Sequence, residues 1–237
     1  MSRFDALKEA AWKCNMELPA LGLVVHTFGN ASVFDRREGF VAIKPSGVQY
    51  EELSPDDIVV VDLQNTVVEG KYRPSSDTKT HTHLYRSFPD IEGIVHTHST
   101  YAVAWAQARR PVPVFGTTHA DMLPVEIPVT PPMTPDMIGG EYEEETGRLI
   151  VRTMAGISPA AVPMVLVGGH GPFVWGDTPK KAVYHALMVE QICRTAYLTL
   201  QINPGAAGLE QGLIDKHFGR KHGPGSTYGQ PGDPELR

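Results

Sequence analysis

The sequence has few cysteines: only Cys14 and Cys193 occur among its 237 residues. They lie far apart, each within a helix-like pattern, and no Cys-x-x-Cys pair or dense cysteine–histidine cluster is present. A disulfide framework and a structural zinc module are therefore not expected. A chain of this length can bury a core without such cross-links, so we expect both cysteines to be buried apolar side chains.

Long apolar runs and an excess of basic residues are also missing. No stretch approaches the roughly 18 consecutive apolar residues of a membrane-spanning helix, and no apolar run follows a basic start. We therefore expect a cytoplasmic protein without a membrane span or a signal peptide. The formal net charge of −6 argues against nucleic acid or an anionic membrane as a partner. A small anionic substrate remains compatible, because the local field of a site can oppose the net charge.

Helix and strand patterns interleave along the chain and predict a single α/β domain over residues 1–230, followed by a disordered tail at 231–237. Short connections between the first strands favour antiparallel hairpins. Helices are expected at residues 2–18, 74–88, 99–106, 141–154, 178–200 and 213–218. Strands are expected at residues 23–28, 40–44, 58–62, 91–98, 164–167 and 173–175, with 66–68 as a continuation or partner of the third and 111–135 as strands or loops.

The expected strand at residues 91–98 ends in the pair His96 and His98. Side chains two apart on a strand share a face, with Cα atoms about 6.5–7 Å apart. The two imidazoles can therefore converge on one ion. Alone, such a pair is more often two surface histidines at a strand end.

Two further residues offer ligands of the same kind. His170 follows an apolar strand and lies between glycines, a position that is more often a turn. Asp77 lies at a predicted helix start, where an N-cap is an equally good interpretation. Imidazoles and a carboxylate are the ligand types that zinc prefers, although spacing alone does not bring these residues together.

Small polar residues and glycines at the ends of elements form a second group. Glycine lets the backbone approach an anion closely, and serine hydroxyls and helix N-termini donate to phosphate. Lys44 would supply positive charge. No Walker or dinucleotide fingerprint is present, so no nucleotide cofactor is expected. Taken alone, each of these turns is more often an ordinary turn without a binding role. The members of this group are Gly29, Asn30, Ser46, Gly47, Ser75 and Ser76.

Two acid–base candidates lie in expected loops. Asp121 ends the sequence Gly-Thr-Thr-His-Ala-Asp, and Tyr228 lies in a tail rich in glycine and serine, where it has little core to fill. The tyrosine is either solvent-exposed or reaches over a site.

Taken in order, these segments resemble the class II aldolase (aldolase/adducin head) family, and within it the L-ribulose-5-phosphate 4-epimerases. Each segment is weak alone, but the set is specific and runs in family order over residues 1–230. The segments are GNAS (29–32), IKPSGV (43–48), PSSDT (74–78), GIVHTHS (93–99), GTTHAD (116–121), GEYE (140–143), HGPF (170–173), DKH (215–217) and YGQ (228–230).

The resemblance implies a three-layer fold with a central, mostly antiparallel sheet flanked by helices. It implies a fourfold-symmetric homotetramer with active sites at subunit interfaces. The implied ligands of a zinc ion, or of manganese or another divalent ion, are His96, His98, His170 and Asp77. The implied substrate and phosphate contacts are Gly29, Asn30, Lys44, Ser46, Gly47, Ser75, Ser76, His217 and Arg220. Asp121 and Tyr228 would be the acid–base pair, reaching the metal from a neighbouring subunit.

The implied reaction is epimerisation at C4 of L-ribulose 5-phosphate to D-xylulose 5-phosphate. The C4 hydrogen is not acidic, so retro-aldol cleavage of C3–C4 is the easier route, with the metal as electrophile. Glycolaldehyde phosphate then rotates and adds back through its other face. Two proton-transfer groups on opposite faces are therefore needed.

Other functions stay open. An aldolase for fuculose or rhamnulose phosphate would be expected to carry glutamate where this chain has Asp77. A hydrolase of the His-x-His-x-Asp type would need aspartate at Thr100, and an adducin-like interaction domain would be expected to lack the histidines. Gly169, where serine is expected, and the proline-rich residues 122–132 depart from the family pattern, which leaves the sugar preference open. The choice between arabinose, ascorbate and another pentose pathway also stays open.

Overall fold

The computed structural model describes residues 2–223 and residue 226. In this part of the chain, seven strands form one open sheet in the order β4-β3-β2-β1-β5-β7-β6, and every neighbouring pair is antiparallel. The strands are β1 (Asn30–Asp35), β2 (Phe40–Ile43), β3 (Val59–Asp62), β4 (Val67–Glu69), β5 (Gly93–His96), β6 (Met164–Leu166) and β7 (Pro172–Gly176). The α-helices are α1 (Asp5–Ala20), α2 (Thr78–Ser87), α3 (Thr100–Ala108), α4 (Thr117–Ala120), α5 (Pro135–Gly139), α6 (Tyr142–Thr153), α7 (Pro179–Ile202) and α8 (Gln211–His222).

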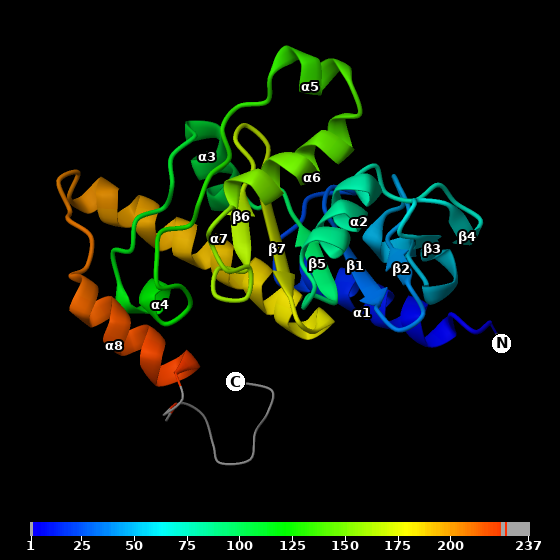
Figure 1. Ribbon diagram of the computed structural model, residues 1–237, viewed down its shortest axis with the longest axis horizontal. Coiled ribbons are helices and arrows are strands. Elements are labelled where there is room, and N and C mark those ends of the chain that lie inside the picture. The colour runs from blue at the N-terminus through cyan, green and yellow to red at the C-terminus, as the bar shows by residue number, and fades with distance from the viewer. Residues whose placement is uncertain (1, 224–225, 227–237) are drawn as a thin grey trace.

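Helices cover both faces of the sheet, which confirms the predicted three-layer architecture. In Figure 1, α2 lies in front of the sheet with α6 against it, whereas α1 and the long α7 lie behind. One apolar cluster runs through both interfaces and includes Val60, Ile94, Val174 and Val189. No helix among the described residues is both long and apolar enough to cross a membrane.

The predicted strand at residues 23–28 is wrong. His26 has a positive φ of 57°, and the side chains of Val25 and Phe28 are 66% and 58% exposed. The chain turns here because it leaves α1 and must reverse before it enters the sheet. The true strand is β1, which begins at Asn30 and is buried almost throughout, so it lacks the alternating pattern that marks a strand with one exposed face.

Other boundaries also differ from the prediction. β5 ends at His96, so His98 lies beyond the strand. Residues 111–135 contain the single-turn helix α4 and the start of α5, both too short to give a helical period. Of the two alternatives for residues 66–68, the structure has the partner strand: residues 67–69 pair with β3. Helix α8 extends beyond 213–218 in both directions. The predicted tail at 231–237 lies outside the described residues.

A buried asparagine completes the sheet where two strands separate. The β1–β2 ladder starts at Ser32 and Ile43, so the preceding residue of β1, Ala31, has no partner on β2. Asn15 of α1 takes that place: its Oδ1 accepts from the Ala31 N–H at 2.8 Å, and its Nδ2 donates to the Ala31 carbonyl at 2.9 Å. The chain after β2 is thereby free to leave β1 and to pair with residues 73–75.

We expect Asn15→Ala to lower the free energy of unfolding by about 2–4 kcal/mol, because it leaves two buried backbone groups of Ala31 unpaired. Urea unfolding measures the effect. Lys13→Ala, on the same helix with a side chain 63% exposed, is the control and should change stability by less than about 0.5 kcal/mol. An equally small effect of both substitutions would contradict this role of Asn15.

Candidate active site

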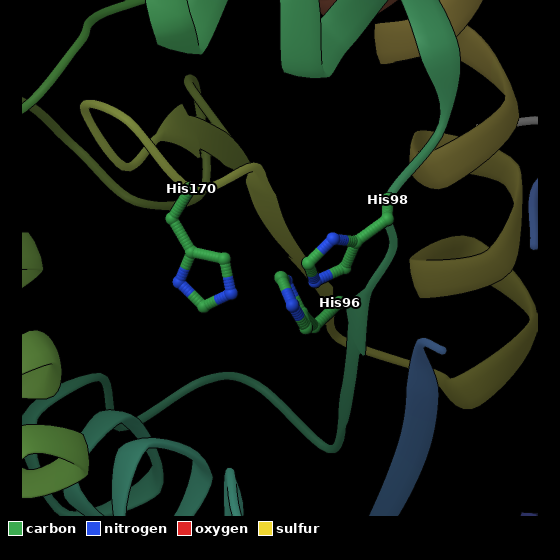
Figure 2. Close-up of side chains that lie close together, drawn as sticks. All are labelled: His96, His98 and His170. Carbon is green, nitrogen blue, oxygen red and sulfur yellow. The ribbon is translucent and has the colours of Figure 1, made fainter. Parts of the chain in front are cut away.

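Three histidines converge beside the end of β5. Each of His96, His98 and His170 offers one ring nitrogen, and these atoms all lie within 4.8 Å of one another. Figure 2 shows the rings facing a common space, with centroids 4.7–5.1 Å apart. His96 ends β5, His98 lies two residues later, and His170 comes from the turn between β6 and β7.

The hydrogen bonds of these rings leave nitrogen lone pairs available. Nδ1–H of His96 donates to the Pro172 carbonyl at 2.9 Å, so its Nε2 carries the lone pair. Nε2 of His96 and Nδ1 of His170 are buried and have no hydrogen-bond partner among the described residues. Burial and the neighbouring His96 lower the pKa of His170 to about 4 and also lower the pKa of His98. Buried and unpartnered ring nitrogens, as in His96 and His170, fit a divalent cation.

Two glycines allow other segments to pack closely against the residues that connect these histidines. Gly29 has φ of +85°, and a Cβ there would lie 3.1 Å from the His96 carbonyl oxygen. A Cβ on Gly171 would lie 2.8 Å from the Thr97 carbonyl oxygen. Larger residues would push the loop before β1, or the turn that carries His170, away from the histidines.

His98 lies outside the sheet, and other elements fix its position. Ser99 is the N-cap residue of α3 but makes no capping hydrogen bond with its side chain. Glu190 of α7 does so instead, accepting from the backbone N–H groups of Tyr101 and Ala102 at 3.0 and 2.9 Å. The ring of Phe28 lies 5.4 Å from the His98 ring.

Asp77 lies next to this centre but outside the group of three rings. It occupies the N-cap position of α2 without a capping side-chain bond, and its Oδ2 accepts from Asn30 Nδ2 at 2.6 Å. Burial raises the pKa of Asp77, but the interactions with His96, His81 and His170 and the Asn30 hydrogen bond outweigh it, so the pKa is lowered. An ionised carboxylate therefore faces the histidines.

The serine and glycine turns expected to hold phosphate lie side by side. Pro45 and Pro74 form an antiparallel bridge, Ser46 N–H donates to the Arg73 carbonyl, and Ser75 N–H donates to the Lys44 carbonyl. Asn30 Nδ2 also donates to Ser75 Oγ at 3.1 Å, which links the turns to Asp77. The exposed members, which leave groups free for a ligand, are Ser46, Gly47 and Ser76.

Lys44 differs from the others, because its side chain is buried. Its Nζ donates to the Val48 carbonyl at 2.6 Å and lies over the Tyr50 ring at 4.8 Å. Burial lowers the pKa of Lys44 to about 8. The ammonium group thus stabilises its own turn in this structure.

Asp121, His217 and Arg220 form a separate cluster between α4 and α8. Asp121 Oδ1 accepts from His217 Nδ1 at 2.9 Å, and its carboxylate accepts from Arg220 at 3.0 Å. Burial raises the pKa of Asp121, but the hydrogen bonds from Arg220 and His217 and the charge of Lys221 outweigh it and lower the pKa. The expected partner Tyr228 lies outside the described residues.

Comparison with known proteins identifies the family. The model of the class II aldolase and adducin N-terminal domain family matches residues 9–197, which is most of the chain. The chain belongs to this family. L-ribulose-5-phosphate 4-epimerase UlaF of Salmonella paratyphi A is 49% identical over 224 residues, 94% of this chain and 98% of that protein. The protein of the same name from Salmonella typhi matches equally well.

Solved structures support the same family assignment. An L-fuculose 1-phosphate aldolase superposes with a TM-score of 0.79 at 28% identity, covering 93% of this chain and 97% of that chain. YgbL from Klebsiella pneumoniae, described as a putative aldolase/epimerase/decarboxylase, gives 0.71 at 25% identity, covering 91% and 99%. The class II aldolase fold is therefore common to proteins whose names differ in the reaction.

Sequence reasoning missed several residues that shape this site. Glu190 acts from almost 90 positions away, and no local signal indicates its role. Tyr50 donates to the Gly29 carbonyl at 2.9 Å, again without a motif. His81 is different: it lies four residues after Asp77 on a predicted helix, and this spacing is a signal that could have placed the two side chains on one face.

We expect Asp121→Asn to loosen α8, because it removes the negative charge shared by His217 and Arg220. Amide hydrogen exchange in α8 should become about ten- to a hundredfold faster, the equivalent of about 1–3 kcal/mol for bonds to a charged group. Because the folded pKa is lowered, this stabilisation is present above the ordinary value of 3.8 and is lost as the pH falls through the folded pKa.

Asp177→Asn is the matched control, since it removes the same charge from an exposed pair with Lys181. It should leave exchange in α8 unchanged. Identical α8 exchange in Asp121→Asn and the parent protein would show that the cluster does not anchor the helix.

Proposed function

We propose that the protein is a divalent-metal-dependent epimerase that converts L-ribulose 5-phosphate to D-xylulose 5-phosphate by inverting C4. The observation that carries this proposal is the convergence of His96, His98 and His170, two of them with unpartnered buried nitrogens. It occurs in a chain that is 49% identical to proteins named as L-ribulose-5-phosphate 4-epimerases.

The three histidines would hold the ion, zinc or manganese, with Asp77 as a fourth ligand. The bound ion supplies electrophilic stabilisation of the negative charge that cleavage of C3–C4 places on the substrate. The geometry around Asp77 supports a weaker ligand, because its carboxylate is already bonded to Asn30 and lies outside the group of three rings. A weakly bound fourth ligand could also dissociate from the ion and leave a coordination position for the substrate.

The paired turns would hold the phosphate end of the substrate. The hydroxyl groups of Ser46 and Ser76 and the backbone of Gly47 and Ser76 would donate to its oxygens. Gly29, Asn30 and Ser75 would lie behind them. Lys44 contributes positive potential from within the turn instead of a direct contact, because its Nζ is bonded to Val48. This grip would keep the glycolaldehyde phosphate bound while its aldehyde group rotates.

Asp121 and Tyr228 would transfer protons on the two faces of the aldehyde. One takes the proton of the C4 hydroxyl as C3–C4 breaks, and the other returns a proton to the C4 oxygen when the bond re-forms on the opposite face. The lowered pKa of Asp121 keeps its carboxylate ionised and able to accept. His217 and Arg220 orient this carboxylate. They would also donate to phosphate oxygens of the substrate.

We propose further that a neighbouring subunit of a homotetramer supplies Asp121 and Tyr228. The carboxylate of Asp121 is bonded to α8 and not to the histidines of its own chain. Phe28, whose ring lies beside His98, and Val25, whose carbonyl accepts from the Phe28 N–H, expose apolar surface, as expected where a second subunit packs.

A class II aldolase reaction on a ketose 1-phosphate is the second candidate, favoured by the superposition on L-fuculose 1-phosphate aldolase. The resemblance drawn from the sequence associates those enzymes with a glutamate at the position of Asp77. The carboxylate of the shorter Asp77 is hydrogen-bonded to Asn30, which argues against its acting as the base.

The activity is tested by incubating the protein with L-ribulose 5-phosphate and following D-xylulose 5-phosphate. We expect turnover in the parent protein, loss after EDTA treatment with recovery on adding zinc or manganese, and a decrease of about a hundredfold or more in kcat for Tyr228→Phe. Tyr197→Phe, at an exposed position on α7, is the control. Full activity after complete metal removal would refute the mechanism. Cleavage of fuculose 1-phosphate without epimerisation of L-ribulose 5-phosphate would favour the aldolase.

The ligand roles predict unequal losses of metal affinity. Asp77→Asn should weaken zinc binding about tenfold less than His96→Asn does, because the imidazole contributes a buried lone pair with no other partner. Competition with a chromophoric chelator measures both affinities. Equal losses of zinc affinity in the two variants would contradict the proposal that Asp77 is the weakest ligand.

A further inference from the structure

Tyr50 is a buried tyrosine that contacts two segments of the proposed phosphate site. It follows the turn at residues 44–48, at the start of a short 3-10 helix (Tyr50–Glu52), and is only 1% exposed. The indole N–H of Trp12 on α1 donates to the Leu53 carbonyl at 2.8 Å. The segment that carries Tyr50 is therefore fastened to the helical layer behind the sheet.

The hydroxyl group of Tyr50 fixes the loop before β1. It donates to the Gly29 carbonyl at 2.9 Å, and the Phe28 carbonyl lies at 3.4 Å. Both neighbours are carbonyl oxygens, which only accept, so the hydroxyl group is the donor. Burial raises the pKa of Tyr50, which keeps this proton in place. Because Gly29 has φ of +85° and no side chain, its peptide group with Asn30 would rotate more freely without this hydrogen bond.

The ring of Tyr50 contacts the second segment, through Lys44. The ammonium group lies over the ring, with Nζ 4.8 Å from the centroid, and donates to the Val48 carbonyl at 2.6 Å. Lys44 is buried, and no carboxylate in the described part of the chain forms an ion pair with it. A buried positive charge without a counter-ion favours the binding of an anion nearby.

Backbone donors without acceptors surround the same place. The N–H groups of Gly29, Gly47 and Ser76 form no hydrogen bond within residues 2–223. The loop before β1 is joined to the serine turn by Asn30, whose Nδ2 donates to Ser75 Oγ at 3.1 Å. An uncompensated ammonium group and free N–H groups on adjoining turns are the groups that recognise a small dianion such as phosphate.

We propose that Tyr50 is a positioning residue of the phosphate site, whose hydroxyl group holds the Gly29–Asn30 peptide against the turn that carries Lys44. Without this bond, the peptide has to be ordered each time that phosphate binds, which lowers the affinity. The inference rests on the proposed function, to whose phosphate site it adds a residue. It depends on neither the metal centre nor the acid–base groups.

Two substitutions that each remove one buried hydroxyl group test this role. Tyr50→Phe keeps the ring against Lys44 and deletes the hydrogen bond to Gly29. Tyr85→Phe is the matched control, because Tyr85 is also 1% exposed and its hydroxyl group donates to the Ser32 carbonyl at 3.0 Å, outside the phosphate turns. Inorganic phosphate is the probe, and calorimetric titration of the zinc-loaded proteins measures its dissociation constant. Thermal unfolding reports separately on stability, and chelator competition on zinc affinity.

We expect Tyr50→Phe to weaken phosphate binding about three- to tenfold, the equivalent of one hydrogen bond, with zinc affinity unchanged. Tyr85→Phe should bind phosphate within about twofold of the parent protein, although its unfolding temperature also falls. Unchanged phosphate binding in Tyr50→Phe would overturn the proposal. An equal loss of phosphate affinity in both variants would also overturn it, because a general loss of packing would then be the cause.

Ser46→Ala separates this inference from the proposed function, because it removes a hydroxyl group from the turn itself. It should weaken phosphate binding as well. If it does not, or if the parent protein binds no phosphate, the turns do not hold phosphate and the role of Tyr50 is refuted together with them. If Ser46→Ala weakens binding and Tyr50→Phe does not, only the role of Tyr50 is refuted. If both weaken binding in a protein without epimerase activity, the role of Tyr50 is supported and the proposed reaction is refuted.

Discussion

The antiparallel register between β1 and β5 is the constraint on which the proposed site depends. It places Asn30 directly opposite His96, so the first residue of one strand meets the last residue of the other. Asn30 then reaches both Asp77 and Ser75, while His96 pairs across β5 and β7 with Phe173, whose ring stacks on its imidazole. A shift of one residue would turn these side chains to opposite faces of the sheet and separate the histidines from the turns. The proposed metal ligands and the proposed phosphate turns are adjacent because this strand pair is aligned in this register.

The same region concentrates buried polar atoms that lack partners, which a protein core normally avoids because each costs free energy. The unpartnered atoms include Asn30 Oδ1 and ring nitrogens of His81, His96 and His170. Their neighbours are well packed: the glycines at 29 and 171 bring backbone against residues 96 and 97, and Glu190 holds the start of α3. Well-packed surroundings with unsatisfied nitrogens are the arrangement expected of a preorganised cation site. A bound ion would offset the free-energy cost of burying these nitrogens away from water.

The sequence predicted the order of most elements and the residues that gather at the site, because apolar strands followed by histidines and caps followed by helices leave local signals. It failed where tertiary context overrides those signals. The run of residues 23–28 has strand propensity, yet it turns out of α1 and leaves β1 to begin at Asn30. Asp77 had the two equally good interpretations of cap and ligand; in the structure its side chain makes no capping bond and accepts from Asn30 instead. Lys44 matched a phosphate turn, but no sequence pattern reveals that its ammonium group bonds to Val48. Long-range partners such as Glu190 and Asn15 leave no local signal.

The proposed division of the chemistry between two parts of the chain has a consequence for assembly. The histidines lie around the end of β5, whereas Asp121 is anchored to α8 by the cluster with His217 and Arg220. An epimerase of the proposed kind needs proton-transfer groups on both faces of a rotating aldehyde. Residues around a single metal centre can approach only one of these faces. Placing the acid–base groups on a different element, presented by another subunit, allows them to approach the substrate from outside the pocket that holds its phosphate. On this view, the exposed apolar side chain of Phe28 beside His98 belongs to the catalytic architecture, because the subunit that covers it would also complete the site.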